Sequence, residues 1–187
     1  MGWWSIRYRR VAKGLLYSWL WQLRGYGVRD RVVIEGQAPY LAGKGELVLG
    51  SRVSFRSLYG RSRLFVRGGA RLELGDRCFI NNGCVIESAL EVVIGDNCMI
   101  GDGVQIRDAA YHQVSEGSEP KRAPVRIGRN VWLANGCMIL PGVEIGDHSV
   151  VGAGAVVSRS VPQRSIVAGN PAVVVGEVTA SDGWIRR

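Results

Sequence analysis

A six-residue period between positions 74 and 157 constrains the fold of this chain more than any other feature. Aliphatic residues recur at every sixth position in four groups of three, and the steps between groups are eight, twenty-one and six residues. An integer period of this kind is typical of repeat proteins, in which similar units stack on one another. The periodic residues are Leu74, Ile80, Ile86, Ile94, Ile100, Ile106, Ile127, Leu133, Ile139, Ile145, Val151 and Val157.

Three six-residue units would make one triangular coil. Each unit would point one aliphatic side chain into a narrow prism, and the Gly, Asp and Asn residues that follow it would turn the corner, because they adopt left-handed backbone conformations most easily. Successive coils would then pair at the usual strand spacing of about 4.8 Å. An ordinary sandwich of short strands does not require an integer period, so we predict an all-β fold, a parallel β-helix.

The four cysteines follow the same pattern. Cys78, Cys84, Cys98 and Cys137 each stand four residues after a periodic aliphatic residue, where other coils have Val, Ser or Ala. We therefore expect small buried side chains and not nucleophiles or disulfides. No C-x-x-C spacing occurs and the chain has only two histidines, which predicts no metal site and a reduced, cytoplasmic protein.

The positive charge is concentrated at one end of the chain. The formal net charge is +8, and residues 1–31 contribute +6 of it through seven basic residues and one Asp. Nucleic-acid binding would favour basic residues spread over a face together with aromatic platforms, and neither follows residue 31. The charge pattern therefore indicates no nucleic-acid partner.

Residues 127–172, "IGRNVWLANGCMILPGVEIGDHSVVGAGAVVSRSVPQRSIVAGNPA", resemble the closing coils of the left-handed β-helix hexapeptide-repeat acyltransferases. Within that family the sequence is similar to the galactoside, maltose and xenobiotic O-acetyltransferases. The resemblance implies a left-handed β-helix, a homotrimer, and acetyl-CoA as acyl donor in a groove between neighbouring subunits. We expect an N-terminal basic amphipathic helix over 1–31, a β-helix acyltransferase domain over 32–176 with an excursion loop at 107–126, and a tail over 177–187.

The resemblance also implies a catalytic residue. The family interrupts its β-helix with one long loop that carries a histidine near its start, and "IRDAAYH" resembles the form I-x-D-S-D-x-H at this place. His112 is thus expected to act as general base, since an imidazole can take the proton of a sugar hydroxyl as that hydroxyl attacks a thioester. A backbone carbonyl, Asp108 or Glu116 could orient the ring. His148 is expected to be a surface turn residue.

Further site residues are implied one by one. Asn81 in "FINNGCVI" matches an acceptor-binding asparagine, but Ala89 replaces the carboxylate that accompanies it, which leaves Asn82, Glu87 and Tyr111 as candidate acceptor contacts. For the cofactor, the family pattern implies an aromatic wall, two backbone amides and a cation. These are Trp132, Ala134, Ala153 and Arg159. Trp132 could equally be an outward aromatic that only covers its coil.

The expected function is O-acetylation of a sugar hydroxyl in cell-envelope polysaccharide or lipopolysaccharide synthesis. An N-acyltransferase acting on an amino-sugar nucleotide and a non-catalytic β-helix scaffold are the alternatives. In a trimer, each site would combine His112 of one chain with Arg159 or Trp132 of the next. A γ-type carbonic anhydrase would need three histidine ligands and is set aside.

The segment before the coils does not follow the six-residue pattern. On a helical wheel Trp4, Tyr8, Val11, Leu15 and Trp19 share one face of residues 1–26, and Arg7, Arg10, Lys13 and Arg24 lie opposite. Lys13 and Gln22 interrupt an apolar run that is too short to cross a membrane. The apolar face could pack on the β-helix or on a neighbouring subunit, or it could contact anionic lipid on the cytoplasmic face of the inner membrane.

Overall fold

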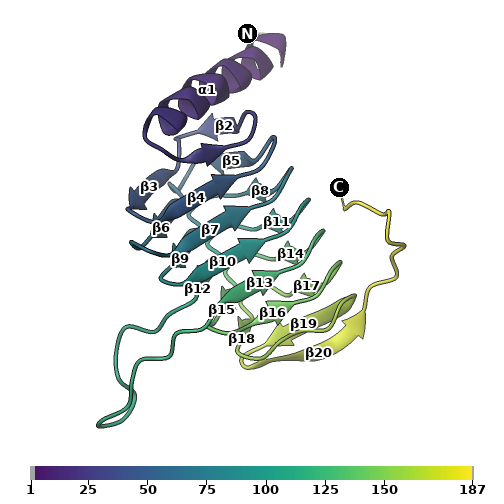
Figure 1. Ribbon diagram of the computed structural model, residues 1–187. Helices are drawn as coiled ribbons and strands as arrows, with labels where there is room; N and C mark the ends of the chain where they lie inside the picture. Colours follow the sequence, from purple (N-terminus) through teal and green to yellow (C-terminus); the bar gives the residue numbers. More distant parts are fainter. Residues whose placement is uncertain (1–2, 187) are drawn as a thin grey trace.

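The computed structural model describes residues 3–186, with the side chains of residues 3–7 and 9 left aside. One helix, α1 (Trp3–Leu23), is followed by a parallel β-helix of short strands wound in triangular coils (Figure 1). The expected all-β fold with one N-terminal helix is confirmed. Among the described residues, no helix combines the length and the apolar character that crossing a membrane requires.

Three parallel sheets form the sides of the prism, and each coil adds one strand to each sheet. The first sheet contains β1 (Gly27–Val28), β4 (Glu46–Leu49), β7 (Arg71–Leu74), β10 (Glu91–Ile94), β13 (Val125–Ile127) and β16 (Glu144–Ile145). The second contains β2 (Val33–Gly36), β5 (Ser54–Ser57), β8 (Phe79–Ile80), β11 (Met99–Ile100), β14 (Trp132–Leu133), β17 (Val150–Val151), β19 (Ser165–Gly169) and β20 (Ala172–Glu177). The third contains β3 (Tyr40–Gly43), β6 (Arg63–Val66), β9 (Val85–Ser88), β12 (Gln105–Arg107), β15 (Met138–Ile139) and β18 (Val156–Val157).

The chain turns a corner between sheets, and these corners carry most of the candidate site. We call the turn from the first to the second sheet the first corner, the next turn the second corner, and the return to the first sheet the third corner. The only antiparallel pairing within the three sheets, as far as residues 3–186 are concerned, joins β19 to β20 at the C-terminal end.

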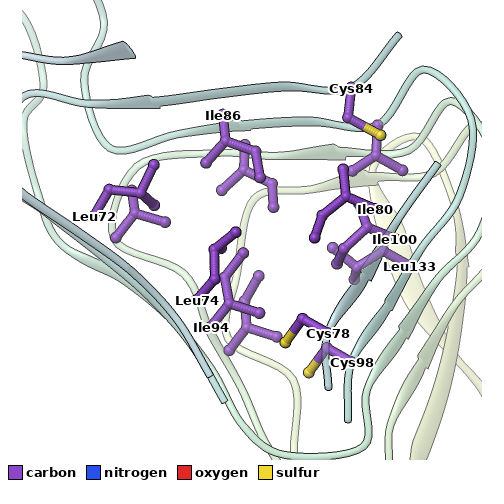
Figure 2. Packing of buried hydrophobic residues seen from close by; sticks show 14 of the residues in the cluster. Leu72, Leu74, Cys78, Ile80, Cys84, Ile86, Ile94, Cys98, Ile100 and Leu133 are labelled. Carbon is purple, nitrogen blue, oxygen red and sulfur yellow. The ribbon is translucent and has the colours of Figure 1, made fainter. Parts of the chain in front are cut away.

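The periodic residues fill the prism as predicted. All twelve are buried, with no more than 3% of any side chain exposed. They stack in register from coil to coil, as in the column Leu74, Ile94, Ile127 and Ile145 of the first sheet, and Figure 2 shows such layers meeting at the centre. The interior is therefore filled by side chains and leaves no room for a ligand inside the prism.

The six-residue period does not extend to the two N-terminal coils. Leu49, Phe55 and Leu64 are buried core residues of one coil, yet they are separated by six and nine residues. Additional residues at the second corner, around 58–62, account for the longer step. The coils therefore begin at Gly27, well before the first periodic residue at Leu74.

The cysteines are buried free thiols, which confirms their predicted role as fillers. Burial raises the pKa of Cys84 to about 11 and that of Cys137 to about 12, and it also raises the pKa of Cys98 well above the ordinary value of a thiol. Three of the thiols donate to backbone carbonyls of the next coil, for example Cys98 Sγ to Gly128 O at 3.0 Å. Cys84, Cys98 and Cys137 therefore stay protonated at neutral pH and are poor nucleophiles.

Helix α1 closes the N-terminal end of the prism. Trp21 is buried against Phe55 with its ring edge-on, the two ring centroids 6.2 Å apart. Gly14 lies so close to β2 that a Cβ atom there would stand 1.9 Å from Val32 O. Ser18 Oγ accepts a hydrogen bond from Val32 N–H at 3.0 Å and donates to Gly14 O. The docked face of the helix is thus made of small and polar residues around one tryptophan.

The opposite face of α1 removes one of the alternatives left open for this helix. Tyr8, Leu15 and Trp19 are each more than half exposed, so the apolar side does not pack on the β-helix of its own chain. The basic side is turned toward the coils instead, where Arg10 pairs with Glu35 at 2.5 Å and Lys13 Nζ donates to Gly36 O. The predicted contributions of Trp4 and Arg7 lie outside the described side chains.

The expectation that His148 is a surface residue is wrong, because the C-terminal tail covers it. Only 1% of His148 is exposed, and its Nδ1 lies 2.8 Å from Asn130 Nδ2. Asn130 Nδ2 also donates to Trp184 O at 2.9 Å, and Asn130 Oδ1 accepts from Arg186 N–H at 2.8 Å. The Trp184 ring stacks on the imidazole at 6.5 Å between centroids. His148 does occupy a turn with a positive φ of 63°, as its sequence position indicated.

Candidate functional site

The excursion loop leaves the prism at the third corner, between β12 and β13 (Figure 1). Its two ends pair as an antiparallel bridge between Ala109 and Arg122. Ala110 N–H donates to Lys121 O at 2.8 Å, and Ala123 N–H donates to Asp108 O at 2.9 Å. These contacts hold the base of the loop, so residues 111 and 112 start from a fixed position on the prism.

Asp108 anchors this base and does not orient the histidine. Its carboxylate is 1% exposed and accepts hydrogen bonds from Ala89 N–H at 2.7 Å, Leu90 N–H at 2.8 Å and Ser88 Oγ at 3.0 Å. All three donors belong to the preceding coil, where Ser88 ends β9 and Ala89 and Leu90 form the third corner. Because its oxygens are used in this way, Asp108 is removed from the three candidates that could hold the ring of His112.

Tyr111 and His112 lie at the start of the loop, on its exposed part. The Tyr111 hydroxyl donates to Glu87 Oε2 at 3.1 Å, and the Arg67 guanidinium lies 4.7 Å from the centre of the phenol ring. Burial and the neighbouring Glu87 carboxylate raise the pKa of Tyr111, so the phenol remains a hydrogen-bond donor at neutral pH. His112 is exposed, and no hydrogen bond to its ring is found within residues 3–186.

A small charged cluster surrounds this place on the third sheet. Glu87 on β9 faces Arg107 on β12, with Arg107 Nε 3.3 Å from Glu87 Oε2. Carboxylate, guanidinium and phenol groups together offer acceptors and donors of the kind that bind sugar hydroxyls. Sequence reasoning included Glu87 and Tyr111 here but missed Arg67 and Arg107, because neither belongs to a recognisable motif.

The two asparagines lie at the second corner, and only one keeps groups for a ligand. Asn82 is 8% exposed; its Oδ1 accepts from Leu58 N–H and Tyr59 N–H, and its Nδ2 donates to Asn81 Oδ1 and Asp102 Oδ1. Both hydrogens of its amide are therefore in use. Asn82 stabilises the corner in this structure, whereas Asn81 is only half-buried and keeps its own amide nitrogen for a further partner.

The four residues implied in cofactor binding are divided among the second sheet, the second corner and the third corner. Trp132 points outward from the second sheet and is 41% exposed, while Ala134 and Ala153 lie at the second corner. Ala134 N–H already donates to Val151 O at 2.9 Å, so the sheet uses this amide. Arg159 is exposed at the third corner, and no ion pair to it is found in the described part of the chain.

The tail adds an unexpected neighbour to Trp132. The Arg186 guanidinium lies 5.9 Å from the centre of the Trp132 ring and 4.8 Å from that of Trp184. It also donates to His148 O at 3.2 Å. Its position near the end of the sequence gave no signal of this contact, since a charged terminus is usually solvated.

Within one chain these groups belong to different corners of the prism. A third-sheet strand separates the second corner, with Asn81 and Ala153, from the third corner, with His112. A strand of four residues such as β9 spans about 13 Å. A shallow hollow of about 550 Å³ lies elsewhere, along the first sheet, and is lined by Arg126–Gly128, Glu144–Asp147 and Ser160–Gln163. In residues 3–186 no group of three or more His, Cys, Asp or Glu side chains could hold a metal ion.

Comparison with known sequences supports the repeat. Residues 124–159 match the bacterial transferase hexapeptide (six repeats), and residues 91–108 match the hexapeptide repeat of succinyl-transferase. A Saccharomyces cerevisiae protein named only provisionally as an acetyltransferase is 40% identical over 118 residues, which cover 61% of this chain and 60% of that protein. Galactoside O-acetyltransferase of Escherichia coli K12 is 33% identical over 117 residues, covering 61% of this chain and 58% of the enzyme. The chain thus spans about three fifths of the length of these relatives.

Solved structures agree with the fold. A galactoside acetyltransferase in complex with coenzyme A is 25% identical with a TM-score of 0.54, covering 79% of this chain and 64% of that one. A maltose O-acetyltransferase of Clostridium difficile 630 is 28% identical with a TM-score of 0.52, covering 79% and 71%. AntD, an N-acyltransferase of Bacillus cereus, reaches a TM-score of 0.71 over 84% of this chain and 86% of its own, but at 16% identity it shows the fold alone.

The repeat, the parallel β-helix and the two comparisons agree with one another. The six-residue units that the sequence displays are the strands and corners of the coils, and residues 124–159 match the bacterial transferase hexapeptide. The chain therefore contains hexapeptide repeats of the kind described for bacterial transferases, and it resembles the galactoside and maltose O-acetyltransferases.

Proposed function

We propose that this chain is an acetyl-CoA-dependent O-acetyltransferase that acts on a sugar hydroxyl, with His112 as its general base. One observation supports this above the others. The loop that carries His112 is fixed at its base by the buried Asp108 carboxylate, so the imidazole starts from a defined place while it stays accessible. A scaffold would have no need for a histidine held in this way.

The chemistry requires one proton carrier. The imidazole takes the proton of the acceptor hydroxyl as its oxygen attacks the thioester carbonyl; the new C–O bond forms, the C–S bond breaks, and the proton passes to the departing thiolate. No covalent intermediate with the protein is needed. The raised pKa values of Cys84, Cys98 and Cys137 agree with this, because none of these buried thiols is a competent nucleophile.

The acceptor is held beside His112 by polar groups of the third sheet and the third corner. Tyr111 offers its hydroxyl, Glu87 its carboxylate, and Arg67 a guanidinium above the phenol. Such a set suits a neutral polyhydroxylated ligand better than an anion, because donors and acceptors alternate. The relatives named as galactoside and maltose O-acetyltransferases support a sugar acceptor.

The complete site is shared between subunits of a homotrimer. The interior of the prism is filled, and His112 lies one sheet away from Asn81 and Ala153 in its own chain, so a neighbouring chain must supply the second wall. An outward apolar column on the second sheet offers a contact surface for it. The column comprises Phe79, Met99, Trp132, Val150 and Ile166, which pair in register. Closed threefold symmetry would create three equivalent sites.

Arg159 has a different place in this arrangement from the one first expected. It lies on the same corner as the loop of His112, whereas Trp132 and Ala153 lie on the second sheet and the second corner. We therefore assign Trp132 and Ala153 to one subunit and His112 to the next, with Arg159 beside His112. Acetyl-CoA is the donor that the coenzyme-bound relative supports.

The test is acetyl transfer to a panel of sugars, followed through release of the free thiol. His112→Ala should lower turnover by a factor of about 10² or more, since general-base catalysis contributes 10² to 10⁴, and it should leave the oligomeric mass unchanged. Gln113→Ala, at the exposed neighbouring position, is the matched control and should keep turnover within about twofold. Equal turnover of the two variants would show that His112 is not the base. Absence of transfer to every acceptor would favour the scaffold, and transfer to an amino sugar alone would favour an N-acyltransferase.

Mixed oligomers test the shared site. Chains carrying His112→Ala and chains carrying Trp132→Ala are purified together through two different tags. If the two residues serve the same site from neighbouring chains, mixed trimers regain activity at the sites where both contributors are unaltered. Mixed oligomers no more active than either parent would contradict the assignment.

A further inference from the structure

The outer face of α1 is an exposed apolar surface. Five large side chains on this face are each more than half exposed, and we call them the outer strip. They are Tyr8, Leu15, Leu16, Trp19 and Leu23. The strip lies opposite the docked residues Gly14, Ser18 and Trp21, so it points away from the β-helix, beyond the end of the prism on which the helix lies (Figure 1).

The docking of α1 explains why this face is left open. Contacts with the coils use Gly14 and Ser18 for close approach and Trp21 for filling, while Arg10 and Lys13 reach Glu35 and Gly36 O. The helix would close the prism equally well with polar residues on its outer face. A surface helix normally carries its charged residues there, and large exposed apolar patches mark interaction sites.

Charge decides between the possible occupants. Residues 1–29 contain six basic residues and no acidic residue. Arg10 and Arg29 find carboxylate partners in Glu35 and Glu73, whereas Lys13 bonds only a carbonyl and Arg24 is exposed at the end of the helix. Two copies meeting strip to strip would bring these acid-free segments together and repel each other. An anionic surface would attract them.

We propose that the outer strip of α1 is a docking surface for an anionic lipid bilayer. Leu15, Leu16 and Leu23 enter the boundary between headgroups and acyl chains, where the amphipathic rings of Tyr8 and Trp19 also settle. Arg24, exposed at the end of the helix, lies near the lipid phosphates. The helix rests in the plane of the interface and does not cross it. In the trimer of the proposed function the three strips would lie at the same end and add avidity, but the proposal does not depend on that trimer.

The experiment measures sedimentation of the full chain with sucrose-loaded vesicles, without acetyl-CoA or acceptor. Vesicles of phosphatidylcholine with about one third phosphatidylglycerol should bind it at least tenfold more strongly than pure phosphatidylcholine, and added salt should weaken this binding. Trp19→Glu should reduce binding to the anionic vesicles by about tenfold or more. The matched control is Val174→Glu, the same charge change at an exposed apolar residue on β20 at the other end of the solenoid, and it should stay within about twofold of the parent.

Three outcomes would overturn the proposal. The parent could fail to sediment with anionic vesicles, or Trp19→Glu could bind as well as the parent. Alternatively, Trp19→Glu could lower the mass of the oligomer while vesicle binding stays the same, which would make the strip an interface between copies. Since Trp19 is more than half exposed, its replacement should leave the fold intact, and circular dichroism checks this. No acetyl transfer is measured, so failure here is separable from failure of the proposed enzyme.

Discussion

Loss of the Asp108 carboxylate should release the excursion loop. In Asp108→Ala, Ala89 N–H, Leu90 N–H and the Ser88 hydroxyl lose their shared acceptor in a place where only 1% of the side chain was exposed. A buried hydrogen bond to a charged group contributes about 1.5–3 kcal/mol, and an unsatisfied buried donor costs about 1–3 kcal/mol. The three bonds share one side chain and are not additive. We expect the free energy of unfolding to fall by about 3–5 kcal/mol.

Two measurements follow the change. Urea unfolding gives the stability, and limited trypsin digestion follows cleavage after Lys121 and Arg122, which pair with the other side of the loop base. Cleavage should become at least about tenfold faster, because a base that opens more often presents these bonds to the protease. Acetyl transfer should fall as well, since His112 loses its defined starting point.

Two further variants show whether the carboxylate itself matters. In Asp108→Asn the side chain keeps its shape, but its NH2 group faces a backbone N–H donor, so the free energy of unfolding should fall by about 2 kcal/mol. Glu116→Ala removes a carboxylate from the exposed part of the same loop and should change stability by less than about 0.5 kcal/mol. If Glu116 orients His112, that variant should shift the pH profile of turnover all the same. The reasoning is refuted if Asp108→Ala is as stable and as protease-resistant as Glu116→Ala.

Two other predictions concern the ends of the solenoid. Gly14→Val should lower the free energy of unfolding by about 2–3 kcal/mol, because its Cβ would meet Val32 O at 1.9 Å and push α1 off β2. Thermal unfolding measures this loss, with Ala12→Val on the exposed face of the same helix as the control. Burial, Arg129 and Arg164 lower the pKa of His148 below its ordinary 6.5, so the unfolded chain takes up a proton first and stability should fall as the pH drops below about 6.5. His148→Asn, which tolerates the positive φ, should show a smaller loss between pH 8 and pH 5.5 in denaturant unfolding.

The core was predictable because one rule generates it. A residue at every sixth position must point inward, and all twelve residues found by this rule are buried. The first two coils were missed because the step from Phe55 to Leu64 carries additional corner residues that break the count. His148 was misplaced for a different reason: its own hexapeptide indicates a turn, and only residues 36 and 38 positions further along the chain, Trp184 and Arg186, bury it.

The candidate site was harder to predict from sequence, since a motif identifies side chains but not the bonds that the fold already uses. Asn82 lies beside the residue that matches an acceptor-binding asparagine, yet its side-chain amide already forms hydrogen bonds with the second corners of the neighbouring coils. Ala134 N–H likewise belongs to the sheet. The sequence allowed Asp108 to orient His112, but in the structure its carboxylate binds three donors on the preceding coil. Such competition depends on register between coils, which no single hexapeptide contains.

The same regularity that makes the core predictable restricts where function can arise. A prism filled by one side chain per hexapeptide has no interior cavity, so a ligand must bind on an outward face or at a corner. Outward positions on the short strands are repeated and similar, and insertions fall at corners or at the ends. In this chain the distinctive segments are therefore the excursion loop with His112, the helix α1 with its exposed strip, and the tail that carries Arg186 to Trp132. Each of them presents its groups away from its own core, which is where a filled prism leaves room for a binding surface.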